Sequence, residues 1–449
     1  MIKTESNKND NTLYDFLYCY EAIVKYGHQI PKIINLIKRR PNRYLQKLGL
    51  INIVNINNGS IEKMMKVMNS LESLEELMIT NTKILKLPKE IKYLANLSIL
   101  NMSNCNLKFI PPEIKYLSYL SELFLQNNDI DVLPDELGNL NELTFLNLEN
   151  NNLKEFPPFL KELTWLNLNS NKIKSFPKTS KIYSVLSFLY LVDNEIEEIT
   201  ENICCFPGLR ELYICQNKIH SINEQGIKFL HRLEIFDLSC NKINTLPKNI
   251  KCLRQLDSLD LSNNNITIIP NEIFKLKYLS RLNMSNNNIS YCLVKGIENL
   301  EDLHQLNLSN NHITVVPKEI KYLTKLETLN LSNNNITVLP KEIKFLRMLS
   351  VLDISNNNLT ALPKEIKYMT NITILNISYN YLTILPKEIK FMIDLEKIYL
   401  AHNNLTTVIN EFKYLKFLKV LDIKYNKINL YLPNNILNPM SVNPKFFVD

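Results

Sequence analysis

The chain repeats one 23-residue pattern along most of its length. Residues 326–348 read LETLNLSNNNITVLPKEIKFLRM, and residues 349–371 read LSVLDISNNNLTALPKEIKYMTN. The shared pattern, LxxLxLSxNxIxxLPKEIKxLxx, recurs about seventeen times between Ile51 and Pro439. Such a chain is predicted to fold as a stacked solenoid, because each repeat buries its apolar face only against its neighbours.

The first half of each repeat has the period of a half-buried strand. Leu329 and Leu331 are predicted to point inward, while Asn330 and Ser332 point outward. Stacking places one strand per repeat in a parallel sheet, with neighbouring strands about 4.8 Å apart. The asparagine after the strand, such as Asn334, is expected to satisfy backbone groups of its own and the adjacent repeat. Two early repeats carry Thr82 and Cys105 there, which are small groups that still donate.

The second half of each repeat is expected to return along the convex side as an extended segment, because its proline fixes φ and has no N–H. Ile343 and Leu346 are predicted to reach back into the core. The Lys and Glu of KEIK are interpreted as a solvated face rather than a docking strip.

This repeat resembles the leucine-rich repeat family, and its LPxEI form is most similar to the intracellular Ras-group class, typified by Ras-suppressor and Scribble-type scaffold proteins. The resemblance implies an α/β solenoid: a leucine-rich-repeat horseshoe with one short parallel strand per repeat on the concave face and a small N-terminal helical cap. It also implies a concave sheet that binds other proteins, with a small GTPase or a phosphatase or kinase complex as plausible partners.

The pattern divides the chain into three parts. Residues 1–50 are predicted to form a helical cap, residues 51–439 the solenoid with a degenerate first repeat at 51–71, and residues 440–449 a tail. Phe446 and Phe447 of the tail are expected either to fold over the last repeat or to meet another molecule. The helical prediction for the cap rests on two runs of apolar residues at helical spacing. The first holds Leu13, Phe16, Leu17, Tyr20, Ile23 and Val24, and the second begins with Pro31 and holds Ile33, Ile34, Leu36 and Ile37.

Three repeats depart from the common length. The repeat at 143–162 is short, and the repeats that start at Leu209 and Leu279 lack the proline. The latter two carry Gly226 and Gly296, each followed by Ile, where we expect a helical turn on the convex side.

The net charge of +7 is concentrated near the N-terminus. Residues 1–50 hold nine Lys or Arg and four acids, a balance of +5, which leaves +2 for the rest. The repeats are therefore close to neutral, and no nucleic acid partner is expected. The basic run of residues 38–40 is interpreted as a solvated cap surface, with an acidic partner or a nuclear signal as the alternatives.

The sequence favours a cytoplasmic location. Its start, MIKTESNKNDN, lacks the apolar segment of a secretory signal, and no run of about 20 apolar residues predicts a membrane span. The eight cysteines show no paired spacing, which suits a reducing compartment. We expect a monomer that binds a protein partner.

The outward strand positions identify a candidate partner-binding surface in the repeats that start at Leu120 through Leu209. Trp165 is the only tryptophan, and Phe145, Trp165 and Phe188 occupy the same repeat position, which predicts a ladder of rings. Trp, Tyr and Arg are enriched at binding hot spots, although aromatic residues also favour strands and can simply cover one another. The candidate residues are Glu122, Phe124, Phe145, Trp165, Phe188, Tyr190, Arg210, Glu211 and Tyr213.

The later repeats carry fewer candidate binding residues at their outward strand positions. From Leu256 to Ile377 the outward positions are uniformly Asn or Asp followed by Ser, which we interpret as a spacer. A weaker second patch lies on the last two repeats, and it either binds an acidic partner or, as we favour, keeps the terminal repeats soluble. Its residues are Lys397, Tyr399, His402, Lys419, Lys424 and Tyr425.

No motif predicts catalysis. The six histidines fall at unrelated repeat positions, and no GxxxxGK phosphate loop is present. Cys215 and Cys240 lie near the ends of neighbouring predicted strands, but their spacing matches no CxxC metal framework. The sequence therefore predicts a non-enzymatic interaction scaffold without a cofactor or metal, with a recognition module for a pathogen or host ligand as the alternative.

Overall fold

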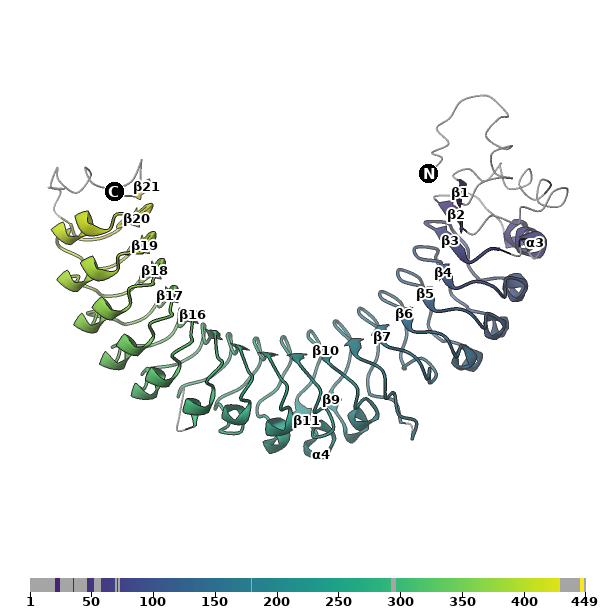
Figure 1. Cartoon of the computed structure of the whole chain (residues 1–449), viewed down its shortest axis with the longest axis horizontal. Coiled ribbons are helices and arrows are strands. Elements are labelled where there is room, and N and C mark those ends of the chain that lie inside the picture. The colour runs from purple at the N-terminus through teal and green to yellow at the C-terminus, as the bar shows by residue number, and fades with distance from the viewer. Residues whose placement is uncertain are drawn as a thin grey trace, which may run out of the picture. The chain divides into compact units, whose positions relative to one another are not determined.

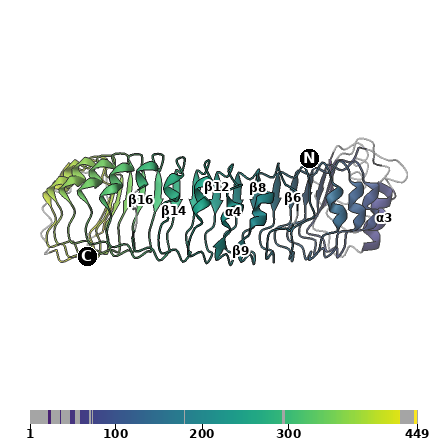
Figure 2. The same cartoon turned by 90° about the horizontal axis from the view of Figure 1, so that it is seen from below.

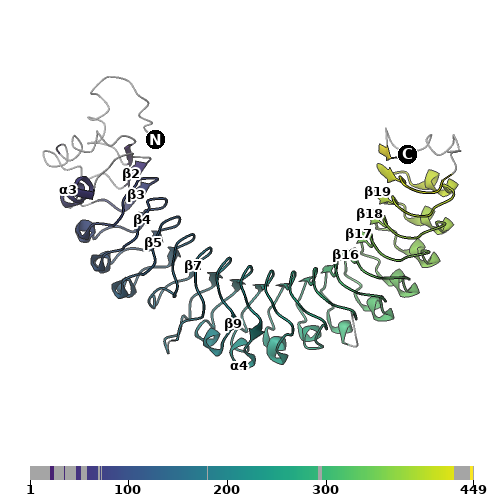
Figure 3. The ribbon, with the colours of Figure 1, turned by 180° about the vertical axis from the view of Figure 1, so that it is seen from behind.

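The computed structural model describes residues 21–24, 35, 47–51, 58–68, 71, 73–178, 180–291, 296–428 and 445–447. The chain divides into two compact units, Met1–Lys218 (unit 1) and Ile219–Asp449 (unit 2). Within each unit every repeat adds one short strand to a parallel sheet. The strands lie on one face, here called the strand face, and helical turns lie on the opposite, helical face (Figures 1 and 3). This arrangement is an α/β solenoid.

Unit 1 holds a parallel sheet whose neighbouring strands pair in register. Its strands are β1 (Glu21–Val24), β2 (Lys47–Ile51), β3 (Glu76–Thr80), β4 (Ile99–Asn101), β5 (Glu122–Phe124), β6 (Phe145–Asn147), β7 (Trp165–Asn167), β8 (Phe188–Tyr190) and β10 (Glu211–Tyr213), with β9 (Glu198–Ile199) apart from them. Its helices are α3 (Asn58–Met68) and the 3₁₀ turns η2 (Lys89–Tyr93), η3 (Pro112–Tyr116), η4 (Asp135–Asn139) and η5 (Glu201–Cys205).

Unit 2 repeats the arrangement with greater regularity. Its strands are β11 (Ser221–Ile222), β12 (Ile235–Asp237), β13 (Ser258–Asp260), β14 (Arg281–Asn283), β15 (Gln305–Asn307), β16 (Thr328–Asn330), β17 (Val351–Asp353), β18 (Ile374–Asn376), β19 (Lys397–Tyr399), β20 (Val420–Asp422) and β21 (Lys445–Phe447). Its helical face carries α4 (Glu224–Ile227), η6 (Lys248–Cys252), η7 (Ile273–Lys275), η8 (Ile297–Asn299), η9 (Lys318–Tyr322), η10 (Lys341–Phe345), η11 (Lys364–Tyr368), η12 (Lys387–Phe391) and η13 (Asn410–Tyr414). Figure 2 shows these turns from the helical side.

The leucines form the core between the two faces, as the alternation predicts. Leu329 and Leu331 are at most 1 % exposed, and Ile343 and Leu346 reach in from the helical side and are fully buried. Each side chain stacks on its counterpart in the next repeat, so the core continues from repeat to repeat.

The buried asparagine joins adjacent repeats, which confirms its predicted role. The Asn334 side-chain amide donates to the carbonyl oxygens of Leu308 and Leu331 at 3.0 and 3.1 Å, and its Oδ1 accepts from the Ile313 N–H at 2.9 Å. Where Cys105 replaces asparagine, its thiol donates to the Ile79 carbonyl, and burial raises the pKa of that thiol to about 11.

The return segment differs from the extended conformation that the sequence predicts. Pro340 is extended, with φ −71° and ψ 150°, but the next five residues turn into η10. The Leu346 N–H donates to the Ile343 carbonyl, and the equivalent bond recurs in most of the other proline-containing repeats, although not in those that carry Pro157 and Pro177. The proline thus starts a 3₁₀ turn, because its fixed φ suits the first position before a helical turn.

The repeats of unusual length differ from the others in the segment on their helical face. Gly296 opens η8 in the left-handed region, with φ 119°, as predicted. In the other long repeat the helix α4 begins before Gly226 and is capped by the side chain of Asn223. In the short repeat, residues 148–164 contain no helical turn.

Within residues 1–50, the structure corrects the helical prediction at residues 21–24. Glu21–Val24 forms β1, which pairs with β2, and β2 pairs in turn with β3. The first described helix, α3, lies within the predicted first repeat and is the small N-terminal helix of this fold, whereas β2 begins at Lys47, inside the predicted cap. The apolar run ending at Val24 therefore includes a strand, because backbone pairing with a neighbouring strand overrides local helical spacing. The rest of the predicted cap, apart from Asn35, lies outside the described residues.

At the other end, β21 extends the sheet. Its backbone pairs with β20 in parallel, with Lys445 beside Val420 and Phe447 beside Asp422. Residues 445–447 therefore add one further strand at the sheet edge.

Candidate functional site

The strand face of unit 1 gathers the predicted aromatic residues. Phe145, Trp165 and Phe188 lie side by side in register on β6, β7 and β8, which confirms that they share one repeat position. Glu122 and Glu211 occupy the same position on β5 and β10. The neighbouring outward position carries Phe124 on β5 and Tyr190 beside Tyr213 on β8 and β10. Arg210 precedes β10 and is exposed.

The rings form one continuous series of contacts, here called the aromatic strip (Phe124, Phe145, Trp165, Tyr190 and Tyr213). The Phe124 and Phe145 ring centroids are 4.8 Å apart, and Phe145 stacks on Trp165 at 4.0 Å and 7°. Trp165 then contacts Tyr190 at 5.2 Å, and Tyr190 stacks on Tyr213 at 5.0 Å and 4°.

The predicted ladder of Phe145, Trp165 and Phe188 is therefore correct for its first pair and wrong for its second. Trp165 turns toward Tyr190 and not toward Phe188. Phe188 is the register partner of Trp165 on β8, and Tyr190 lies two residues further along that strand. The repeat position fixes where a side chain starts, whereas its rotamer decides which neighbour it meets.

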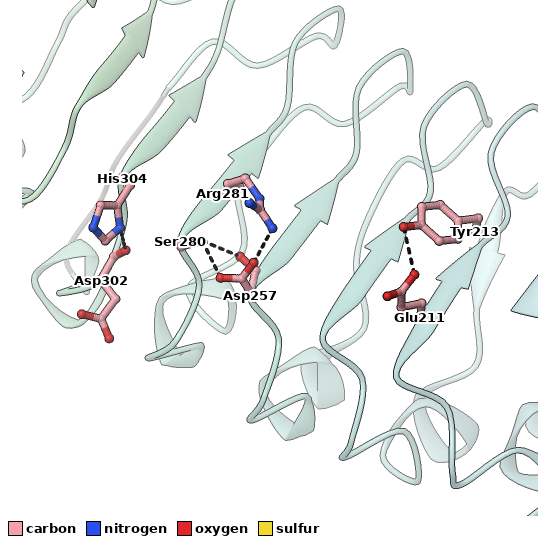
Figure 4. A network of polar contacts seen from close by, with 7 residues as sticks. All are labelled: Glu211, Tyr213, Asp257, Ser280, Arg281, Asp302 and His304. Carbon is pink, nitrogen blue, oxygen red and sulfur yellow. Dashed lines mark hydrogen bonds and ion pairs between the residues drawn. The ribbon is translucent and has the colours of Figure 1, made fainter. Parts of the chain in front are cut away.

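All six aromatic candidates are half-buried, and five of them contact a neighbouring ring. Charged groups border them. The Tyr213 hydroxyl donates to Glu211 Oε2 at 3.1 Å (Figure 4). Burial raises the pKa of Tyr190, and the negative charge of Glu211 raises it further, while a hydrogen bond with Trp165 opposes the shift. The arrangement offers an amphipathic surface with an acidic and a basic group at its end.

The strand face of unit 2 is polar and internally paired. In six of its strands, β13 to β18, the Asn or Asp side chain accepts two hydrogen bonds from the serine two residues on, as Asn330 does from Ser332 at 3.0 and 2.8 Å. This face also carries an ion pair that the repeat pattern does not predict. Asp257 accepts from Ser280 and forms an ion pair with Arg281 (Figure 4). Arg281 lies at the strand position that Thr328 occupies on β16, so comparing that one position across repeats would have found it.

The second predicted patch is organised around a stack that includes a residue the prediction missed. Tyr379, His402 and Tyr425 stack in sequence, with centroid distances of 4.1 and 4.2 Å. All three have φ near 55°, at the position where most repeats carry asparagine, which tolerates that conformation best. In the sequence, this stack is indicated by a large aromatic residue at the same turn position in three successive repeats.

The other residues of this patch surround the stack. Tyr399 and Lys424 line a pocket of about 330 Å³ together with the three stacked rings. Lys397 lies beside Val420 in register, and Lys419 forms an ion pair with Glu396 at 2.8 Å. The patch therefore mixes cations with paired acids and is only weakly basic.

In the described part of the chain, no group of three or more His, Cys, Asp or Glu side chains has the geometry to hold a metal ion. Among the same residues, no helix has the length and apolar content needed to cross a membrane.

Comparison with known families identifies the repeat. A profile described as "Leucine-rich repeat region" matches residues 184–330 and 315–440, and one described as "Leucine Rich Repeat" matches residues 96–117 and 142–163. No curated protein matches the chain.

Similar solved structures come from bacteria and plants. A leucine-rich repeat protein of Leptospira interrogans is 31 % identical, with a TM-score of 0.68, over 93 % of this chain and 91 % of that one. An internalin of Listeria monocytogenes is 24 % identical, with a TM-score of 0.59, over 68 % of this chain and 87 % of that one. The Arabidopsis receptor kinase HAESA, in complex with the peptide hormone IDA and the co-receptor SERK1, is 22 % identical, with a TM-score of 0.58, over 95 % of this chain and 81 % of that one.

Proposed function

The chain belongs to the leucine-rich repeat family, whose members generally serve as protein-interaction modules, and from this premise we propose that it is a non-enzymatic scaffold that binds a partner protein on the strand face of unit 1. The aromatic strip carries the proposal. It places five touching rings across consecutive strands, whereas the strands of unit 2 present polar side chains that already bond to one another.

The composition of the strip supports a protein surface as its ligand. Tyrosine and tryptophan bury a large area at low entropic cost and dominate binding hot spots. Glu122, Arg210 and Glu211 border the rings and would set the orientation of the partner. The partner is expected to present an apolar centre with charges of both signs around it. The patch around Tyr379, His402 and Tyr425 is a candidate for a second, weaker contact.

We place this activity in intracellular signalling in the cytoplasm. The support is the LPxEI form of the repeat, which resembles the Ras-group class, and the scattered cysteines. A small GTPase or a phosphatase or kinase complex is the kind of partner that this resemblance favours.

The alternative is a recognition module for a pathogen or host ligand. The similar structures of a Listeria internalin and of a plant receptor bound to a peptide hormone favour it, although at this identity they support only a shared fold. Cell fractionation separates the two functions, since a surface or secreted location favours recognition and a cytosolic one favours the scaffold.

The test is affinity capture of the tagged chain from its native cell, quantified by mass spectrometry. The test variant replaces three strip residues with residues found at the same positions in regular repeats: Trp165→Val, Tyr190→Asn and Tyr213→Asn. These changes remove the rings but keep repeat geometry, as Val351 and Asn330 show. We expect the main partner to be lost from the variant, by about tenfold or more in recovery.

The matched control substitutes the same repeat position as Phe145, Trp165 and Phe188 in three consecutive repeats of unit 2, with Thr328→Ala, Val351→Ala and Ile374→Ala. It should keep the partner. Recovery of the partner by the strip variant, with the control unchanged, would show that the binding surface lies elsewhere.

A further inference from the structure

The helical face of the regular repeats follows a rule in which each KEIK lysine has a ring beside it. Lys321 lies 4.9 Å from the centroid of Tyr322, Lys344 lies 5.1 Å from that of Phe345, and Lys367 lies 5.1 Å from that of Tyr368. A glutamate precedes each of these lysines by two residues. Every such cation therefore has an aromatic face and a nearby carboxylate in its own repeat.

The repeat that contains η6 breaks both parts of this rule. Cys252 stands where the ring is expected, and Asn249 stands where the glutamate is expected. Lys251 is consequently left with neither partner within its own turn.

The next repeat departs as well. Phe274, at the position that corresponds to Lys251, is fully buried and packs beneath Gly296, where an added Cβ would lie 3.1 Å from the ring. With the phenylalanine turned inward, Lys275 takes the outward place of the ring, and Lys277 and Tyr278 follow it. Neither of these two adjacent repeats therefore has a ring at the usual position, which Cys252 occupies in one and Lys275 in the other.

These departures create a pocket of about 460 Å³, here called the basic pocket (Lys251, Cys252, Arg254, Lys275, Lys277 and Tyr278). Its lining contains four cations and no carboxylate. Within the described ranges, none of the four cations forms an ion pair. The small side chain of Cys252 leaves the space that a ring fills in the regular repeats.

We propose that the basic pocket binds a small, multiply phosphorylated anion. Four cations that converge without a counter-charge favour a ligand with several negative charges. The guanidinium of Arg254 can contact two phosphate oxygens at once, and the three lysines add compact charges around it. The pocket volume lies within the range of small-ligand sites, about 300–1,000 Å³.

The neighbouring repeats limit the ligand to a compact one. In the repeat after Lys277 the helical face turns acidic, with Glu298, Glu301 and Asp302, and Asp302 pairs with Lys325 at 2.6 Å. In the repeat before, Lys228 is engaged by Gln225 at 2.9 Å and by the ring of Phe229. The four cations of the basic pocket therefore lie on two repeats, which fits a small anion better than the long track needed by a nucleic acid backbone.

The test is calorimetric titration of the full chain with inorganic tripolyphosphate and, separately, with inositol hexakisphosphate. The variant Lys251→Glu, Arg254→Glu should weaken binding by about tenfold or more. The matched control is Lys344→Glu, Arg347→Glu, which reverses the same two positions in a regular repeat that keeps Phe345 and Glu342. This control should bind within about twofold of the wild type.

Two further variants restore the common repeat and are expected to fold because other repeats carry those residues. Cys252→Tyr fills the pocket and gives Lys251 a ring without changing the net charge, and Asn249→Glu returns the missing carboxylate. Each should reduce the affinity by about fivefold or more. The aromatic strip plays no part, so its variant should bind the anion as the wild type does.

The outcomes distinguish linear phosphates, ring-borne phosphates and nucleic acid as the ligand. Tighter binding of tripolyphosphate or of inositol hexakisphosphate assigns the pocket to linear or to ring-borne phosphates, and either supports the proposal. Three results overturn it: no binding of either probe, equal loss in the regular-repeat control, or binding of a single-stranded RNA that rises with its length and exceeds both small anions.

Discussion

At the scale of single residues, the buried asparagine of each repeat stabilises the packing of adjacent repeats through its side-chain hydrogen bonds. One amide serves carbonyl groups in two repeats and one N–H in the preceding repeat, as Asn334 does. These groups lie away from water, so losing the amide leaves them unsatisfied.

Replacing Asn334 with Leu should therefore lower the free energy of unfolding of the surrounding repeats by about 1–3 kcal/mol or more. Amide hydrogen exchange measures this locally, and the Ile313 N–H should exchange faster because it loses its acceptor. Asn335→Ala is the control, since that side chain is exposed. Unchanged exchange at Ile313 in the Leu variant would contradict the assignment.

The strip contains a titratable reporter in Tyr190. Burial is the largest cause of its raised pKa and Glu211 the second, so Glu211→Gln should lower the pKa but leave it above the ordinary value. The folded state disfavours the phenolate, so the stability that Tyr190 contributes is present below the unfolded pKa of about 10 and is lost as the pH rises through the raised value.

Carbon-13 NMR of ring-labelled tyrosine, followed against pH, measures this pKa. Glu122→Gln is the control, because that carboxylate is not among the causes of the shift. A Tyr190 pKa that does not respond to Glu211→Gln would show that the two side chains lie apart in solution.

At the scale of elements, the ends of a sheet need protection. An open strand edge pairs readily with another chain, and β21 covers the edge of β20 with a further parallel strand. The covering strand comes from beyond the last recognisable repeat, so it depends on backbone pairing rather than on the repeat pattern.

Removing residues 429–449 should uncover β20 and promote self-association, because its N–H and C=O groups lose their partners. Light scattering after size exclusion compares the truncated chain with the full one at equal concentration. A milder variant, Phe446→Pro, removes one backbone donor of β21 and should show the same trend. A truncated chain with an unchanged mass distribution would show that β21 is not needed to protect the edge.

At the scale of the whole molecule, repeat periodicity predicted the strands, the buried leucines and the asparagine bridges, because each depends on one position that recurs in every repeat. It failed where the chain leaves the pattern. The residues before Lys47 have no repeat to guide them, and β1 takes its conformation from pairing with β2. The repeat pattern does not predict the 3₁₀ turns, because the fixed φ and missing N–H of proline fit an extended segment as well as the start of a turn.

For the candidate site, the sequence predicts which repeat position each side chain occupies but not which rings touch. The sequence placed Phe145, Trp165 and Phe188 at one position, but it could not choose between Phe188 and Tyr190 as the neighbour of Trp165, since that choice depends on rotamers. The basic pocket went unnoticed because the helical face was interpreted as a uniform solvated surface. Comparing Cys252 and Asn249 with their counterparts in other repeats exposes it.

The central claim is that the partner binds where unit 1 departs from the regular repeat, at the aromatic strip. Trp165 is the only tryptophan of the chain and lies within that strip, so 5-fluorotryptophan labelling gives a single fluorine-19 NMR signal from the site itself. Adding the protein captured from the native cell should shift or broaden this signal in proportion to the bound fraction. Binding of that protein, measured in the same sample, with the fluorine signal unchanged would contradict the account.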